Sequence, residues 1–236
     1  MLIQDRILTK VGLGIAIGML SVTLQGNLIA HAQDDFMPLP NQKYALCAGA
    51  LSFNFDGITY AKCRKLRGDS VTLTHAYPPG VLNKNIETVN KIGTAPNNRS
   101  FRVSTYSPPN SSIYAVYECT EPGAYAQCDG GLCFENTSGK PFPGVGPVAR
   151  HEIICSCPIV TTDSVYHVTG PAACPTTLAE YNAVCGAGAA QAQTADGVIL
   201  RIGSSGPADT QKAQDDYYDQ QFGTTSTMKK CERPAG

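Results

Sequence analysis

Ten cysteines, all between residues 47 and 231, constrain the fold of this chain of 236 residues more than any other feature. The number is even. In an oxidising compartment such a set is normally joined into disulfide bonds, whereas in a reducing compartment it points to metal binding or thiol chemistry. The first question is therefore whether the protein is located in an oxidising or a reducing compartment.

The first 32 residues have the pattern of a secretory signal peptide. Arg6 and Lys10 form a basic start, residues 11–30 carry no charge, and Ala30-His31-Ala32 has the small residues that signal peptidase accepts. We expect cleavage after Ala32, a secreted or periplasmic location, five disulfide bonds and no membrane span in the mature chain. The alternative is an uncleaved anchor, because an uncharged stretch of this length can just cross a bilayer.

Charge and composition exclude two further classes of protein. The 18 Lys and Arg are balanced by 19 Asp and Glu, so the chain lacks the positive charge with which proteins neutralise nucleic-acid phosphates. It is 42% hydrophobic, which is too apolar for a disordered chain. We expect one or two domains with hydrophobic cores.

The mature chain repeats itself in order. YALCAGALSF at 44–53 and YAQCDGGLCF at 125–134 are identical at six of ten positions. Asp-Ser-Val follows at the same distance after Cys63 and after Cys157, and FRVSTYSP at 101–108 aligns with LRIGSSGP at 200–207. Each copy then ends in a cysteine. We expect a tandem duplication with Cys-rich β modules over 42–121 and 123–231.

Asp56-Gly57 predicts a tight β-hairpin in the first module. The pair separates two alternating runs, and a type I′ turn needs positive φ at both central positions. The resulting register places Ser52 opposite Ala61. It also puts the large side chains on one face, which we expect to be the buried one. These residues are Leu51, Phe53, Phe55, Ile58 and Tyr60.

The alignment of the two copies predicts three disulfide bonds. Cys133 and Cys155 take the places of Ser52 and Ala61, a non-hydrogen-bonded pair whose close approach permits a cross-strand bond. Both cysteines are absent from one copy and present in the other. The predicted bonds are Cys47–Cys63, Cys128–Cys157 and Cys133–Cys155.

Four cysteines remain, and their pairing is less constrained. We expect Cys174–Cys185, since neither has a counterpart in the first copy, together with Cys119–Cys231. Thr177 and Glu180 form a capping box that predicts a short helix near 177–185. A helix between Cys174 and Cys185 would hold the two too far apart unless it ends early. The alternative pairing, 119–174 with 185–231, stays open.

The most distinctive loop covers residues 137–151, between the predicted strands of the second hairpin. It has fifteen residues, against two in the first copy, and is rich in Gly and Pro. Long loops on a rigid scaffold often carry binding residues, although a tolerated insertion is the alternative. The candidate binding residues are Lys140, Phe142, Arg150 and His151.

No motif predicts catalysis, a metal site or a cofactor. The mature chain contains His75, His151 and His167, and no G-x-S-x-G sequence presents a nucleophile to them. His151 with Cys155 and Cys157 has spacing that zinc accepts, but export favours disulfides at these cysteines.

The Y-A-x-C-x-G-x-L-x-F blocks, the Asp-Gly hairpin and EIICSCPI at 152–159 resemble a set of uncharacterised, predicted-secreted, Cys-rich bacterial proteins. The resemblance implies export and no particular activity. We expect a mainly β protein of two tandem disulfide-stapled β-hairpin modules. It would be a secreted binding or structural protein without catalytic activity, with an extracellular protein or glycan as partner. The alternatives are an extracellular inhibitor presenting stapled loops, and a small hydrolase in which a cleft brings His151 or His167 to a carboxylate.

Overall fold

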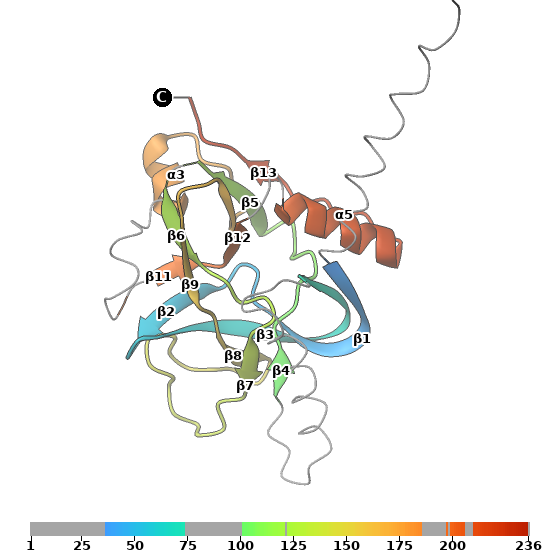
Figure 1. The fold of residues 1–236 in the computed structure, drawn as a ribbon. Helices are drawn as coiled ribbons and strands as arrows, with labels where there is room; N and C mark the ends of the chain where they lie inside the picture. The colour runs from blue at the N-terminus through green and yellow to red at the C-terminus, as the bar shows by residue number, and fades with distance from the viewer. Residues whose placement is uncertain are drawn as a thin grey trace, which may run out of the picture.

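The computed structural model describes residues 36–73, 101–120, 122–185, 197, 199–205 and 210–235 (Figure 1). The predicted signal peptide and His75 lie outside these residues. The described strands and helices are β1 (Phe36–Leu46), β2 (Leu51–Phe55), β3 (Ile58–Leu73), β4 (Arg102–Val103), β5 (Tyr114–Cys119), β6 (Gly123–Ala126), β7 (Leu132–Phe134), β8 (Glu152–Ser156), β9 (Ile159–Thr162), β10 (Tyr166–Pro171), α3 (Leu178–Cys185), β11 (Ile199–Arg201), β12 (Gly203–Ser205), α5 (Thr210–Phe222) and β13 (Lys230–Cys231).

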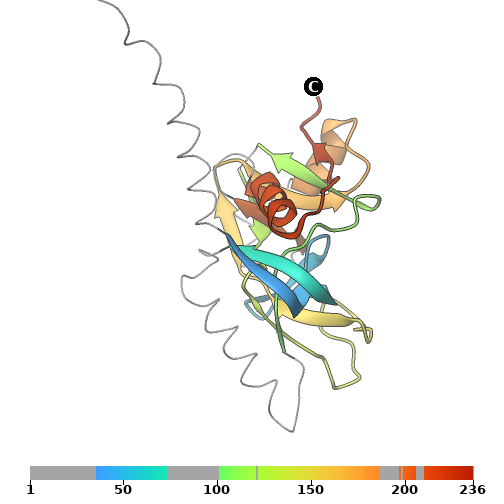
Figure 2. The same cartoon turned by 90° about the vertical axis from the view of Figure 1, so that its right-hand side faces the viewer.

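The described strands form three sheets, so the prediction of a mainly β, disulfide-rich protein is confirmed. The largest has seven strands in the order β11-β2-β3-β8-β7-β4, with β1 also paired to β3. A second sheet has the order β12-β10-β5-β13, and β6 pairs with β9 in a third. Helix α5 packs on β1 (Figure 2). At this contact the rings of Phe36 and Tyr217 lie 5.4 Å apart.

The predicted hairpin is present with its predicted register. Ser52 lies opposite Ala61, and Phe55 lies opposite Ile58. Asp56 and Gly57 have φ values of 51° and 72°, as a type I′ turn requires. Because Gly pays no steric penalty there and Asp a small one, this dipeptide fixes the turn and therefore the pairing.

The predicted buried face of this hairpin is wrong. The buried side chains are the small and polar ones, whereas Leu51, Phe55 and Ile58 are 46%, 43% and 46% exposed. The inner face meets a core built largely of cysteine and alanine, in which half-cystines leave room for little more than a methyl or hydroxyl group. The buried residues of the hairpin are Ser52, Asn54, Thr59 and Ala61.

Three disulfides of this core join the predicted partners. In each bond the two Cα atoms lie 4.0–4.5 Å apart, the spacing of directly opposed strand positions. Cys133 also faces Cys155 in the β7–β8 ladder. The bonds are Cys47–Cys63, Cys128–Cys157 and Cys133–Cys155.

The other two bonds correct the predicted pairing, because the structure contains Cys119–Cys185 and Cys174–Cys231. Neither predicted set, 119–231 with 174–185 or 119–174 with 185–231, is formed. The reason is the helix: α3 is helical up to Cys185 and carries this residue to the end of β5, away from Cys174. Strand β13 runs parallel to β5 and holds Cys231 level with Tyr117, not with Cys119.

The helix that causes this pairing begins as predicted. The amide of Glu180 donates to Oγ1 of Thr177 at 3.2 Å, and Oε2 of Glu180 accepts from the amide of Thr177 at 3.2 Å. This is the reciprocal pattern of a capping box. The predicted short helix near 177–185 is therefore confirmed.

Positions that align between the two sequence copies are paired alike. Ala45 faces Lys65 as Ala126 faces Ile159, and Ser52 faces Ala61 as Cys133 faces Cys155. The ranges 42–121 and 123–231 are nevertheless interleaved in one sheet. β4, from the first range, pairs with β7, whereas β11, from the second, pairs with β2.

Candidate functional site

The long loop lies against the outer face of the large sheet. Its Phe142 ring is 4.9 Å from the ring of Tyr60 in β3 and 5.9 Å from that of Phe134 in β7, in edge-on and tilted arrangements. Such aromatic pairs contribute about 0.5–1.5 kcal/mol beyond burial. Phe142 is therefore an anchor that holds the loop on the sheet.

Gly144 brings the loop backbone onto the hairpin. Its φ is 72°, and a Cβ at this position would lie 1.8 Å from Cδ1 of Phe53. The loop turns just here, because Phe142 and Gly146 exchange backbone hydrogen bonds of 2.8 and 2.9 Å. Only glycine permits both this conformation and this approach.

A cavity of about 440 Å³ lies between the loop and the first hairpin. We call it the hairpin–loop cavity. Its size is in the range of small-ligand sites. Its large apolar lining residues are Leu46, Leu51, Phe53, Val145 and Ile199, with the phenol ring of Tyr114. Its charged or titratable lining residues include Lys62, Arg64, His151 and Glu152.

Two of the charged lining residues, Lys62 and Glu152, already contact other groups. Lys62 Nζ lies 3.7 Å from Oε2 of Glu152 and donates to the carbonyl of Pro147 at 3.2 Å. The same Glu152 oxygen accepts from the amide of Ala149 at 2.7 Å. Among the described lining residues, the one carboxylate is thus held by the loop and by Lys62, and Arg64 adds a second positive charge to the cavity.

The structure brings only part of the predicted binding set together. Phe142 anchors the loop and His151 lines the cavity, whereas Lys140 and Arg150 are exposed and outside the lining. Sequence reasoning missed Leu51, Lys62 and Arg64, because it assigned the hairpin's large side chains to the core. The available signal was the small, polar composition of the alternate positions, 52, 54, 59 and 61.

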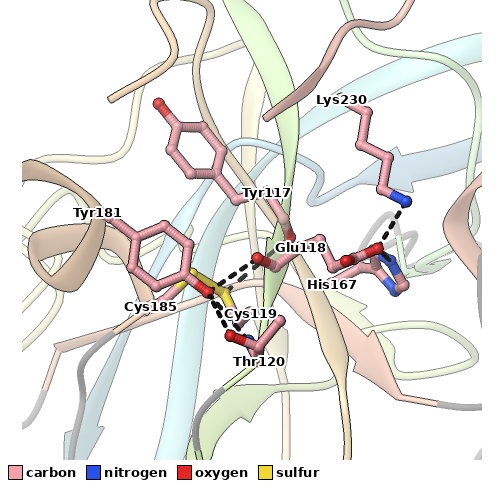
Figure 3. Close-up of polar contacts among 8 residues, drawn as sticks. All are labelled: Tyr117, Glu118, Cys119, Thr120, His167, Tyr181, Cys185 and Lys230. Carbon is pink, nitrogen blue, oxygen red and sulfur yellow. Dashed lines mark hydrogen bonds and ion pairs between the residues drawn. A yellow bond between two sulfur atoms is a disulfide. The ribbon is translucent and has the colours of Figure 1, made fainter. Parts of the chain in front are cut away.

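A second polar cluster lies where β5, β10 and β13 meet (Figure 3). His167 and Glu118 face each other across the β5–β10 ladder, with Nε2 3.6 Å from Oε2. Lys230 Nζ lies 2.5 Å from the same carboxylate oxygen. His167 is only 2% exposed, so a buried imidazole lies beside this carboxylate, at a separation slightly longer than a hydrogen bond.

This cluster borders a cavity of about 340 Å³. Helix α5 and the C-terminal segment form its other walls. The lining residues are Val116, His167, Asp215, Asp216, Asp219, Ser226, Met228 and Lys230. The lining of this cavity therefore contains a histidine and several carboxylates.

Tyr181 ties α3 to the end of β5 beside this cluster. Its hydroxyl donates to the carbonyl of Glu118 at 2.9 Å and accepts from the amide of Thr120 at 2.9 Å (Figure 3). The Cys119–Cys185 bond joins the same two elements. The C-terminal end of β5, which carries Glu118, is therefore held both by the Tyr181 hydroxyl and by a disulfide bond.

Asp129 is a carboxylate whose pKa is strongly raised. Burial raises its pKa to about 7, and the hydrogen bonds that it accepts only partly oppose this. Oδ2 accepts from the amide of Leu73 at 2.9 Å, and Oδ1 accepts from Thr72 at 3.1 Å. It also contacts Gln214, so it links the end of β3 to α5.

Among the described residues, the side chains close enough to share a metal ion are Cys47, Cys63 and Cys128, and all three sulfurs are in disulfide bonds. The predicted zinc alternative used Cys155 and Cys157, whose sulfurs are also bonded. In the same part of the chain, neither helix has the length and apolar character needed to cross a bilayer.

Comparison with known proteins does not place the chain in a family: no family model, no curated protein and no solved structure matches it.

Proposed function

We propose that this chain is a secreted, disulfide-rich binding protein without catalytic activity, and that its partner is an extracellular protein or glycan bound at the hairpin–loop cavity. The observation that carries the proposal is the first hairpin, which buries its small and polar side chains and exposes its large apolar ones. Exposing large apolar side chains is unfavourable by about 25 cal/mol per Å². A face that keeps them exposed beside an open cavity is therefore typical of an interaction site.

The disulfides support export. Five bonds leave no free cysteine among the ten. Such a set persists in oxidising compartments and is rare where thiols are kept reduced. Together with the signal-peptide pattern of residues 1–32, this favours a periplasmic or extracellular protein.

We also propose that the chain arose by tandem duplication. The equivalent registers of Ala45–Lys65 and Ala126–Ile159 support this, as do those of Ser52–Ala61 and Cys133–Cys155. In this view the strand β4 of the first copy pairs with the hairpin of the second copy, and the strand β11 of the second copy pairs with the hairpin of the first. The loop of residues 137–151 was then added to one hairpin, where it created the cavity.

The binding proposal is tested with labelled mature protein on arrays of glycans and of extracellular protein fragments. We expect ligands whose binding is lost in Ile199→Asp, because Ile199 lines the cavity. Ile113→Asp is the matched control, since Ile113 is 54% exposed and Ile199 58%, yet Ile113 is not in the lining. If a ligand binds both variants as tightly as it binds the unmodified protein, the cavity is not its binding site.

A small hydrolase is the second candidate function, favoured by the buried His167–Glu118 pair at a cavity that also contains Ser226. A carboxylate near an imidazole, in a cavity that also contains a hydroxyl group, supplies the side chains used in general-base catalysis. The test is release of p-nitrophenol from a panel of esters and glycosides. Turnover that disappears in His167→Asn and persists in His151→Asn would favour the hydrolase; no turnover by the unmodified protein would remove it.

A further inference from the structure

The geometry of the cavity and its surroundings points to one class of partner, and this inference rests on the proposed binding function. We propose that the partner is a protein segment in which an Asp or Glu side chain lies next to large apolar side chains. The carboxylate enters the hairpin–loop cavity, and the apolar side chains cover the hairpin beside it.

The apolar half of the surface consists of neighbouring residues on three adjacent strands. We call it the apolar patch. Phe55 faces Ile58 across the β2–β3 hairpin, while β11 places Ile199 opposite Phe53 and Arg201 opposite Leu51. The patch residues and their exposures are Leu51 46%, Phe55 43%, Ile58 46% and Ile199 58%. Three of the four are aliphatic, which favours contact with protein side chains over stacking with sugar rings.

The charged half favours an anion. Among the described residues, two permanent cations, Lys62 and Arg64, line the cavity against the single carboxylate of Glu152, and the imidazole of His151 offers a further hydrogen-bonding group. Glu152 accepts the amide of Ala149, pairs with Lys62 and lies opposite Arg64 in the β3–β8 ladder, so this single negative charge is shared between two positive charges. An incoming carboxylate forms charge-assisted hydrogen bonds with these groups, whereas an incoming ammonium group meets like charge.

The two halves form one continuous surface. Leu51 and Ile199 belong to the apolar patch and also line the cavity. A single short segment can therefore place its carboxylate in the cavity and its apolar neighbours on the patch. A buried charged contact surrounded by apolar contacts is a common arrangement of interface hot spots.

The probe is a displayed library of random short peptides, selected on the full mature protein and on variants. We expect selected peptides to carry Asp or Glu beside Leu, Ile, Val or Phe. Arg64→Glu should weaken them by about tenfold or more, since it replaces attraction by repulsion. Leu51→Asp should weaken them as well.

Arg67→Glu is the matched control. Arg67 is exposed, lies on the same strand and is outside the cavity lining, so the same change of charge there should alter affinity by less than about twofold. A general effect of net charge would change both variants equally and would overturn the inference.

Other outcomes separate the inference from the function on which it rests. The inference is overturned if the selected peptides are neutral or basic. It is also overturned if the selected peptides are acidic but their affinity is unchanged by Arg64→Glu. Glycans bound in a manner that depends on Ile199, with no peptide selected, also overturn it and leave the proposed binding function in place. If neither peptides nor glycans bind in a cavity-dependent manner, both proposals fail.

Discussion

Ala61 of β3 lies directly opposite Cys155 of β8, at the centre of the large sheet. The sequence alignment equates these two positions with each other. When each residue of one flanking pair is replaced by its aligned equivalent, the result is the other flanking pair. The two hairpins are therefore related by an approximate local two-fold axis. These flanking pairs are Tyr60–Ser156 and Lys62–Ile154.

The equivalence of the hairpins predicts that a sixth disulfide can be built into the first one. Ser52 and Ala61 are paired as Cys133 and Cys155 are, so Ser52→Cys with Ala61→Cys should oxidise spontaneously. Closing so short a loop should raise the free energy of unfolding by roughly 2 kcal/mol. Mass spectrometry under non-reducing conditions and urea unfolding would measure both effects. Each single variant should keep one free thiol, and a double variant with two free thiols would contradict the equivalence.

Asp129 predicts how stability depends on pH. Its pKa of about 7 in the folded protein lies above the ordinary value of 3.8, so the folded state binds the proton more tightly than the unfolded state. This contribution is fully present below about pH 4 and is lost as the pH rises through 7. Because Asp129 as a whole is only half-buried, we expect about 1–2 kcal/mol.

Asp129→Asn should remove most of this pH dependence. Urea unfolding at pH 5 and pH 8, with the disulfides intact, compares the variant with the unmodified protein. Asp163→Asn, at an exposed position, is the control and should leave the dependence unchanged. A variant at residue 129 with the full original dependence would show that another group is responsible.

Gly144 and Gly146 of the long loop allow a steric clash to be distinguished from backbone strain, because both have positive φ but only Gly144 lies against another side chain. Gly144→Ala should displace the loop from the hairpin, because the new methyl group would overlap the ring of Phe53. Gly146→Ala has a similar φ of 73° with no atom within 4 Å, so it should lose only about 1 kcal/mol from backbone strain. Limited proteolysis of the loop should be much faster for the first variant. Equal rates for both would argue against close contact between the loop and Phe53.

The start of α3 should depend on Thr177. Thr177→Ala removes the acceptor for the amide of Glu180 and should lower the free energy of unfolding by about 1 kcal/mol. Thr177→Ser keeps a hydroxyl group and should be close to neutral. Urea titrations of the oxidised proteins would measure the difference, and equal losses for Ala and Ser would exclude the cap as the cause.

The sequence predicted local pairing well, because turn chemistry and strand periodicity act over short distances. Asp56-Gly57 was sufficient for the hairpin register, and the register then indicated the Cys133–Cys155 bond. Thr177 and Glu180 were sufficient for the start of α3.

The buried face and two disulfides could not be predicted in this way, because they depend on distant segments. Burial at Ser52 is decided by Leu200 and the half-cystines, which arrive from elsewhere in the chain. The partner of Cys119 is decided by where α3 ends and where β13 lies. The candidate site was only half predicted for the same reason, since the loop was recognised and the surface beneath it was assigned to the interior.

The pairing of β11 with β2 has a consequence for biosynthesis. The strand that completes the edge of the first hairpin, β11, is among the last to be synthesised, and it comes from the far end of the chain. A polypeptide emerging N-terminus first therefore exposes an incomplete sheet until nearly all of it has been translated. Oxidation of Cys47 and Cys63 needs no later segment, so this bond can act as an early clamp that preserves the first hairpin while it waits for its partner strand.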